Sequence, residues 1–378
     1  AFAALRDGEL DVVLTTPEFL HFHAGRFADA GRVRFVVVDE AHHVGLARAG
    51  HRPAYARLGE ALERLGGPLV LAVTATASDE VATQIGAVLG IDEVVLDPTV
   101  RDNLAIEDRR TATEKDAYLA ALAAKGEKLI VYVNSREASV RLARMLRKKV
   151  PDLAWKTAFY NGGLSRSVRH AVERAFRDGE VQAIVATSAF GEGVNIPDVR
   201  HVVLYHLPFS AVEFNQMAGR GGRDGAVARV HLLFGEKDAR INETILSSLA
   251  PDREDLAALY RVLRGIAEKE GAGFEITNGE LAERCQAVRR GCRLDDKGVS
   301  AGVGVFRDLG LVTGEGHGAY RRLTLVDDAP KVELTSSVRY AEGVDEMEQF
   351  GQFREWVLEA PAEELLARFN RPILPTHV

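Results

Sequence analysis

The chain has 378 residues, 46% of them hydrophobic and 27% charged, and its 48 basic and 55 acidic side chains give a net charge of −7. It is too apolar for a disordered protein and long enough for two or three domains with cores of their own. The acidic balance argues against a surface coated with nucleic-acid-binding charge, but it allows a local groove that holds a phosphate backbone. No run of about 18 apolar residues and no secretory leader is visible, so we expect no membrane partner.

Short aliphatic runs alternate with helix-period segments along the first 240 residues. The runs predict strands at 11–15, 34–39, 68–74, 128–134, 181–187 and 201–205. Because they are continuous rather than alternating, they are typical of parallel strands buried on both faces by helices. The repeated strand–helix order predicts an α/β fold. Asp97-Pro98 interrupts the pattern, so we expect one domain over 1–98 and a second over 99–240.

The chain changes character after residue 240. We expect a helical connector over 241–274 and a small domain over 275–326, in which Thr277–Glu280 fits a capping box that opens a helix. Two helices followed by a glycine-rich turn and a strand pattern favour a winged helix-turn-helix; a small α/β appendage without a ligand is the alternative. Apolar residues at helical spacing predict a helical tail over 327–378 that packs on the core.

The stretch Val36–His43 reads VVVDEAHH, an aliphatic strand that ends abruptly in ionisable groups. Acids just past the carboxyl end of a buried parallel strand lie where α/β sheets bind ligands. Asp39 could hold a hydrated Mg²⁺ and Glu40 could orient or deprotonate a water, as nucleotide hydrolysis requires. The alternative is that both acids only cap the helix that follows.

Further motifs follow strand ends in a fixed order. They are TTPE at 15–18, TAT at 74–76, ATSAFGEGVN at 186–195 and QMAGRGGRDG at 216–225. In this order the motifs resemble superfamily 2 helicases, and together with HRPAYARLGE at 51–60 they resemble the RecQ family. The resemblance implies two RecA-like lobes, of which the first is incomplete here, followed by the winged-helix domain and the helical tail.

The resemblance also implies roles for single residues in binding and hydrolysing ATP. Asp39 would hold Mg²⁺ through water, Glu40 would activate the attacking water, and His42 with Thr74 and Thr76 would couple the phosphate state to the nucleic acid. Gln216, Arg220 and Arg223 would come from the second lobe, where a guanidinium group neutralises charge on the γ-phosphoryl group. Gly193 would lie against the nucleotide. Asn195 stands where the family usually has Asp, which weakens the expected contact to the sugar or the arginines.

The implied nucleic-acid partner is single-stranded or forked DNA. We expect contacts mainly to phosphates, made by hydroxyl groups, backbone N–H groups and helix N-termini. The candidates, most of which follow strands directly, are Thr16, Ser135, Arg136, Tyr160, Thr187 and Ser188. For Tyr160, a packed aromatic side chain is the alternative.

Three features depart from the family pattern. No glycine-rich phosphate loop with Lys and Ser or Thr occurs in the 378 residues, so we expect an N-terminally truncated fragment that is inactive alone; a degenerate lobe that never hydrolyses ATP is the alternative. Ala47 and His51 occupy positions that are aromatic in the family. Cys285 and Cys292 are too few for the family's four-cysteine zinc subdomain, so we expect no zinc and a reducing cytosol.

The sequence therefore favours the C-terminal portion of an ATP-dependent 3′→5′ DNA helicase of DNA repair and recombination, placed in the cytoplasm at the nucleoid. Polarity and DNA preference come from the resemblance alone. One alternative is a nucleic-acid-binding accessory module fused to an upstream nuclease, such as a RecJ-type exonuclease, or to another repair protein. A second alternative is an RNA-directed motor of the same superfamily.

Overall fold

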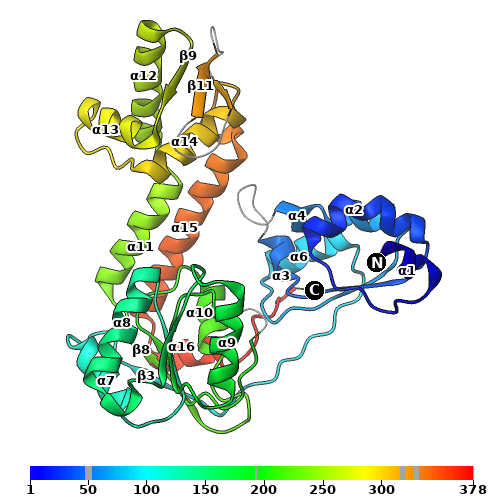
Figure 1. Ribbon diagram of the computed structural model, residues 1–378, viewed down its shortest axis with the longest axis vertical. Helices are drawn as coiled ribbons and strands as arrows, with labels where there is room; N and C mark the ends of the chain where they lie inside the picture. The colour runs from blue at the N-terminus through cyan, green and yellow to red at the C-terminus, as the bar shows by residue number, and fades with distance from the viewer. Residues whose placement is uncertain (47–52, 192–193, 316–320, 327–331, 378) are drawn as a thin grey trace. The chain divides into compact units, whose positions relative to one another are not determined.

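The computed structural model describes residues 1–46, 53–191, 194–315, 321–326 and 332–377 (Figure 1). The chain forms two compact units. Unit 1 comprises residues 1–99 together with the C-terminal segment from Pro372, and unit 2 comprises Val100–Arg371. The chain therefore crosses between the units twice, at 99–100 and at 371–372.

Unit 1 is built around two parallel strands, β1 (Phe35–Val38) and β2 (Leu69–Ala72), with Phe35 opposite Leu69 and Val38 opposite Ala72. One face of this pair packs against an apolar core of helical side chains that includes Leu20, Phe27, Leu62 and Ile85. Its helices are α1 (Phe2–Asp7), α2 (Pro17–Ala30), α3 (His42–Gly45), α4 (Pro53–Ala56), α5 (Leu58–Arg64) and α6 (Asp79–Leu89). Side-chain caps start the two longest helices, because Thr16 accepts the Phe19 N–H and Ser78 the Val81 N–H.

The opposite face of β1 and β2 is exposed. Phe35 and Val37 are 52% and 54% exposed, and their partners Leu69 and Leu71 are 72% and 48% exposed. The predicted strand at 11–15 is wrong: these residues form no strand. A strand exists only with a hydrogen-bonded neighbour, and Asp11–Thr15 has none among the described residues.

The C-terminal segment returns to unit 1 just after β2. Ile373 forms a parallel bridge with Thr76: the Ala77 N–H donates to the Ile373 carbonyl at 2.8 Å, and the Ile373 N–H donates to the Ala75 carbonyl at 3.1 Å. The Asp79 carboxylate accepts from the Thr376 N–H and hydroxyl, both at 2.6 Å, and from the His377 N–H at 2.8 Å. The last residues of the chain are therefore part of this unit.

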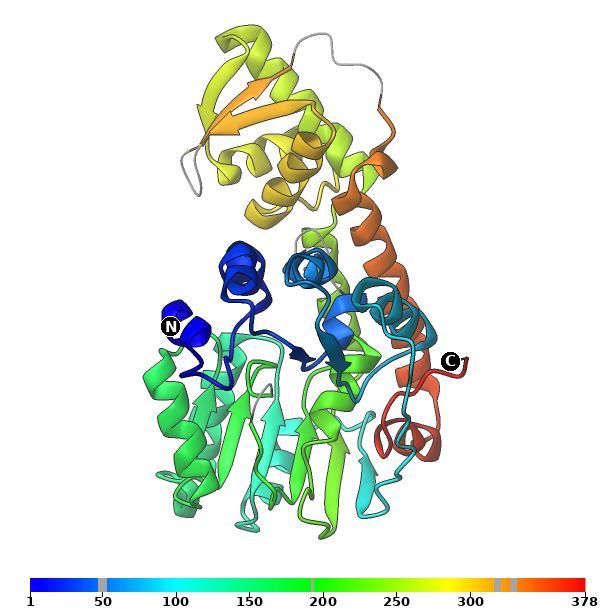
Figure 2. The same ribbon diagram turned by 90° about the vertical axis from the view of Figure 1, so that its right-hand side faces the viewer.

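Unit 2 contains a six-stranded parallel sheet in the order β3-β8-β7-β4-β6-β5 (Figure 2). Its strands are β3 (Leu104–Asp108), β4 (Leu129–Tyr132), β5 (Thr157–Tyr160), β6 (Ala183–Ala186), β7 (His201–Leu204) and β8 (Ala228–Leu232). The strands are connected by helices and one short turn, namely α7 (Lys115–Ala123), α8 (Arg136–Lys149), η1 (Pro151–Leu153), α9 (Arg166–Arg177) and α10 (Ala211–Ala218). Neighbouring residues of β4, such as Ile130 and Val131, enter two separate apolar clusters. The central strands are thus buried on both faces, and the predicted α/β fold is confirmed.

A smaller three-stranded antiparallel sheet, in the order β10-β11-β9, lies further along the chain. Its elements run α12 (Arg253–Glu270), β9 (Gly273–Ile276), α13 (Asn278–Val288), α14 (Asp296–Asp308), β10 (Val312–Glu315) and β11 (Arg321–Leu325). The predicted capping box is confirmed, because the Thr277 side chain and Glu280 bond each other's backbone N–H. The core contains Leu259 and Leu263 of α12, so this helix belongs to the same packing unit as α13 and α14.

The predicted helical tail is also confirmed. It consists of the turn η2 (Leu334–Ser336), α15 (Val338–Glu359) and α16 (Ala362–Phe369), and α15 packs beside α11 (Glu236–Leu249) (Figure 1). Arg354 of α15 forms ion pairs with Glu236 and Glu243 of α11. Phe353 and Phe369 surround Phe214 in the larger core of unit 2. Among the residues that the structure describes, no helix is both long and apolar enough to cross a bilayer.

Candidate functional site

The predicted carboxylates form a tight turn directly after β1. Glu40 has a φ of +50°, the only positive φ of a described residue other than glycine, and this left-handed conformation is costly for a residue with a Cβ. The turn is held because the Glu40 N–H donates to Asp39 Oδ1 at 2.9 Å and the Ala41 N–H donates to the Val73 carbonyl at 3.0 Å. The Asp39 side chain stays exposed. Backbone strain at a carboxylate is a common feature of functional sites.

His42 connects this turn to the end of β2. The imidazole is only 1% exposed, and its Nδ1 lies 3.1 Å from Thr74 Oγ1 and 3.3 Å from Glu40 Oε2. Thr74 Oγ1 also accepts the Thr76 N–H at 3.2 Å. One imidazole therefore contacts both the Glu40 carboxylate and the Thr74–Thr76 turn. The hydroxyl of Thr76 is buried and has no hydrogen-bond partner among the described residues.

The predicted cations lie in unit 2, at the carboxyl end of α10. Gln216 belongs to α10, and Arg220 and Arg223 follow it in a glycine-rich loop. Arg220 Nη1 donates to the Val194 carbonyl at 2.7 Å, whereas its Nε is buried without a partner in the described part of the chain. Arg223 Nη1 lies 3.3 Å from Asn195 Oδ1, so the residue that departs from the family pattern contacts an arginine.

Two residues of unit 2 that no motif indicated contact this loop. The Arg101 guanidinium and the Asn103 amide donate to backbone carbonyls between Gly219 and Ala226. Their signal in the sequence is weak, since a single Arg and a single Asn after a domain boundary have no periodicity or spacing that predicts a contact about 120 residues away.

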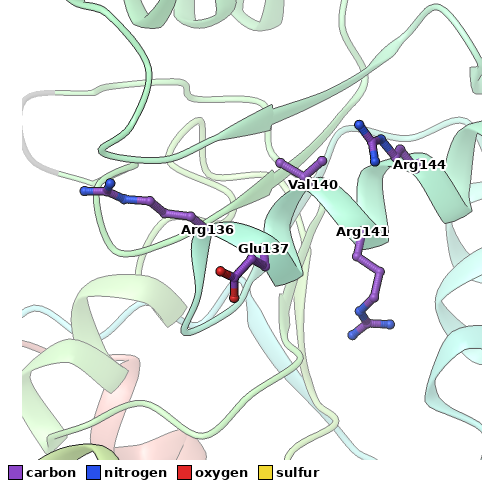
Figure 3. Close-up of a pocket in the computed structure, with 5 residues that line it drawn as sticks. All are labelled: Arg136, Glu137, Val140, Arg141 and Arg144. Carbon is purple, nitrogen blue, oxygen red and sulfur yellow. The ribbon is translucent and has the colours of Figure 1, made fainter. Parts of the chain in front are cut away.

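Three of the six candidates for nucleic-acid contact lie at helix starts. Thr16 caps α2, and Ser135 caps α8 by accepting the Ala138 N–H at 3.0 Å. Arg136 is exposed in the first turn of α8, and it lines an open hollow with Glu137, Val140, Arg141 and Arg144 (Figure 3). Backbone N–H groups and cations at a helix N-terminus suit an anion.

The candidates that follow β5 and β6 are engaged within the fold. The Thr187 N–H donates to the Tyr160 carbonyl at 3.1 Å, and the Ser188 hydroxyl contacts the Glu213 carboxylate, whose pKa burial raises. Tyr160 is 3% exposed, packs against Phe190, and donates its hydroxyl to Glu173 Oε1 at 2.5 Å. Burial raises the pKa of Tyr160 to about 12. Its ring is therefore packed in the core in this conformation.

Several expectations fall outside the described residues, namely those on Gly193, Ala47 and His51. The candidates for ATP binding and coupling that the structure describes form two sets. Unit 1 brings together Asp39, Glu40, His42, Thr74 and Thr76, and unit 2 brings together Gln216, Arg220 and Arg223. Each set is assembled by backbone and side-chain hydrogen bonds within its own unit.

Comparison with known proteins gives a consistent result. The DEAD/DEAH box helicase model matches residues 2–85, and the helicase conserved C-terminal domain model matches residues 114–225. The fold is similar to that of the Mycobacterium smegmatis helicase Lhr bound to ssDNA and AMP-PNP, with a TM-score of 0.51 and 19% identity over 86% of this chain and 46% of that one. The two family-model matches define a superfamily 2 helicase of the DEAD/DEAH-box class, and the likeness to Lhr shows the fold.

Two curated relatives narrow the class. The probable ATP-dependent DNA helicase RecS of Bacillus subtilis is 33% identical over 63% of this chain and 48% of its own length. The ATP-dependent DNA helicase RecQ of Pasteurella multocida is 32% identical over 70% of this chain and 42% of its own length. The chain belongs to the RecQ family, and it spans less than half the length of these two relatives.

Proposed function

We propose that this chain is the C-terminal part of an ATP-dependent DNA helicase that translocates 3′→5′ in DNA repair and recombination. The observation that carries the proposal is the His42 imidazole, whose Nδ1 lies 3.3 Å from Glu40 Oε2 and 3.1 Å from Thr74 Oγ1. A second α/β unit adds a loop that bears arginines. Such a pair of sites would couple ATP hydrolysis to movement of the lobes. Carboxylates from one lobe and arginines from the other would both have to reach the same triphosphate before hydrolysis could occur.

The residues present fit ATP and Mg²⁺. The exposed Asp39 carboxylate supplies the oxygen ligands that Mg²⁺ prefers. The buried Nε of Arg220, which has no partner among the residues that the structure describes, can donate to a phosphate oxygen. When bound, the cation would neutralise charge on the phosphates. Glu40 would orient the attacking water and accept its proton, and Arg220 and Arg223 would stabilise charge on the transferred phosphoryl group.

The exposed apolar face of β1 and β2 supports an incomplete first lobe. Parallel strands rich in Val and Leu are normally covered on both faces, and here four side chains of one face are about half exposed or more. We propose that further strands and the phosphate-binding loop come from sequence outside these 378 residues. The chain by itself would then have negligible ATPase activity.

DNA is the proposed partner, in a cytosolic protein associated with the nucleoid. Thr16, Ser135 and Arg136 would contact the DNA phosphates directly. Tyr160, Thr187 and Ser188 would be further contacts of the same DNA strand or would hold the residues that contact it. The order helix–strand–helix–helix–strand–strand from α12 to β11 supports a winged helix. Cys285 is buried in its core, and we propose that this domain folds without zinc.

The test compares the 378-residue chain with a longer protein that carries the preceding sequence. We expect DNA-stimulated ATP hydrolysis and unwinding of 3′-tailed duplexes only for the longer protein. Glu40→Gln and Arg220→Ala should lower its kcat by at least about 100-fold, with DNA affinity retained. Glu63→Gln, at an exposed position of α5 outside the motifs, should have no effect. A longer protein that binds DNA with salt-dependent affinity but hydrolyses no ATP would be an accessory module. Unwinding of RNA duplexes alone would indicate an RNA motor.

A further inference from the structure

We propose that Arg101, assisted by Asn103, is a positioning residue that holds the loop from Gly219 to Ala226, here called the arginine loop, in the conformation that presents Arg220 and Arg223. The inference rests on the proposed function of these two arginines. It adds to the proposed ATP site a residue that no motif or comparison assigns. This residue lies where the chain enters unit 2, and it fixes the backbone of the arginine loop.

Arg101 holds the backbone on both sides of Arg220. Its Nη1 donates to the Gly219 carbonyl at 2.8 Å, and its Nη2 donates to the Gly221 carbonyl. Burial lowers the pKa of the Arg101 guanidinium. A planar guanidinium group with two fixed donors sets the orientation of both carbonyls, which a single ammonium group could not do.

Asn103 holds the next part of the same loop. Its Nδ2 donates to the Gly222 carbonyl at 2.7 Å and to the Ala226 carbonyl at 2.8 Å. Gly222 has a φ of +54°, and a Cβ at this position would lie 2.6 Å from both Asn103 Nδ2 and the Ala226 carbonyl oxygen. The loop therefore passes so close to Asn103 that a side chain at Gly222 is excluded.

The loop needs this support because glycine leaves its backbone free to reorient. Independent contacts fix the parts beyond Arg220: the Gly222 N–H donates to the Val199 carbonyl at 2.8 Å, and Asp224 forms an ion pair with Arg200. The Gly219 and Gly221 carbonyls face Arg101 instead. Without Arg101, the Gly221 carbonyl loses this donor, and the Gly219 carbonyl keeps only the longer contact from Arg223 Nε at 3.5 Å among the described residues. The Arg220 N–H still donates to the Met217 carbonyl at 3.2 Å, so the end of α10 stays in place while the peptide groups around Arg220 can reorient.

Arg101 also lies where both crossings between the units meet. It is the second residue after the crossing at 99–100, and its N–H donates at 2.6 Å to the carbonyl of Asn370, two residues before Pro372 begins the return to unit 1. The Arg101 backbone therefore joins the first and last segments of unit 2, next to the residue contacts that hold the arginine loop.

The test uses the longer protein with its preceding sequence, and it compares kcat and KM for ATP in Arg101→Ala, Arg101→Lys and Asn103→Ala. We expect Arg101→Ala to lower kcat about 10- to 100-fold, since a displacement of about 1 Å at a catalytic group has effects of this size. KM for ATP should change less than about threefold. Arg101→Lys should restore activity only in part.

Arg110 provides a matched control. Its guanidinium group also donates to backbone carbonyls, those of Val357, Leu358 and Ala360, but it lies away from the arginine loop. Arg110→Ala should lower the melting temperature at least as much as Arg101→Ala and leave kcat within about threefold of wild type. An equal loss of kcat in both variants would overturn the proposal, because it would reflect general destabilisation.

A double-mutant cycle in the Arg220→Ala/Arg223→Ala background separates positioning of the arginine loop from any other role. If Arg101 acts through these two arginines, Arg101→Ala should slow the doubly substituted enzyme by less than about twofold. If it slows this enzyme and the wild type by the same factor, Arg101 does not act through the arginine loop and the inference is wrong. Should the wild-type longer protein hydrolyse no ATP, the proposed function fails instead, which is a different result. Hydrogen exchange of residues 219–226 then still tests whether Arg101 holds the arginine loop. Arg101→Ala should accelerate this exchange, and Arg110→Ala should not.

Discussion

His201 and His231 form a buried hydrogen-bonded pair between the neighbouring strands β7 and β8. His201 Nδ1 lies 3.0 Å from His231 Nε2, and the outer nitrogens reach Glu127 Oε2 at 2.8 Å and the Tyr118 hydroxyl at 2.8 Å. His231 is 2% exposed, and burial lowers its pKa to about 3. Burial also lowers the pKa of His201. The folded protein therefore keeps the His231 imidazole neutral at pH values where the unfolded chain protonates it.

This burial predicts a stability that depends on pH. Because the folded pKa of His231 lies below its unfolded value of about 6.5, its stabilising effect is complete above pH 6.5 and is lost as the pH falls towards 3. Between pH 7.5 and pH 5 the free energy of unfolding of unit 2 should fall about 2 kcal/mol more in wild type than in His231→Gln. Trp356, which packs against Phe214 and Phe353 in unit 2, reports its unfolding. Parallel pH profiles for the two proteins would contradict the prediction.

At the level of single residues, the sequence predicted the groups that follow strands and missed those that act at long range. Glu40, His42 and Thr74 were predicted because each follows an aliphatic run, and parallel strands end at one edge of a sheet. Arg101 and Asn103 were missed because their partners are backbone carbonyls of a loop more than 100 residues away. A backbone carbonyl leaves no mark in the sequence, since every residue has one.

The same contrast holds for whole elements. The central strands β4, β6 and β7 were predicted from continuous aliphatic runs. Strands β3 and β5, which lie at the two edges of the sheet, and β8 beside β3 were missed. The edge strand β3 contains Glu107, because an edge strand is covered on fewer sides than a central one. Strand β8 contains the buried His231, which interrupts its aliphatic run. The run at 11–15 shows the converse, since an aliphatic pattern forms no strand without a neighbour to pair with.

The C-terminal segment gives a prediction about an element. The Thr376 hydroxyl and the nearby N–H groups lower the pKa of Asp79, so the carboxylate holds this segment at pH values above about 4 and releases it as the pH falls through the lowered pKa. In Asp79→Asn, the bridge between Thr76 and Ile373 should open more often. Hydrogen exchange of a peptide over residues 72–80 should then become faster at pH 7, because the Ala77 N–H loses its acceptor, the Ile373 carbonyl.

Glu80→Gln is the control, because Glu80 is exposed in the same first turn of α6. It should leave the exchange rate unchanged, whereas deletion of residues 373–378 should reproduce the effect of Asp79→Asn. Equal protection of residues 72–80 with and without the segment would show that it does not hold the turn after β2. Since Thr74 and Thr76 lie in that turn, this element connects the end of the chain to the proposed coupling residues.

At the scale of the whole molecule, the exposed face of β1 and β2 distinguishes an incomplete lobe from a finished one. Val37 and Leu71 are direct cross-strand neighbours, and both are about half exposed. In a finished lobe further elements would cover them, and burying the exposed half of each side chain would contribute roughly 1 kcal/mol. In the 378-residue chain the same side chains add only exposed apolar surface, which favours association.

The double substitution Val37→Glu with Leu71→Lys should therefore have opposite effects in two contexts. In the 378-residue chain it should reduce binding of a hydrophobic dye and aggregation, with little change in melting temperature. In the longer protein it should lower the free energy of unfolding by about 3 kcal/mol or more, since two charges would enter a covered interface. Trp155→Lys is the control, because Trp155 is 95% exposed as a single side chain in unit 2 and should be neutral for stability in both. Identical behaviour of the double variant in the two proteins would mean that this face stays open in the intact molecule, and the proposal that preceding sequence completes the lobe would fail.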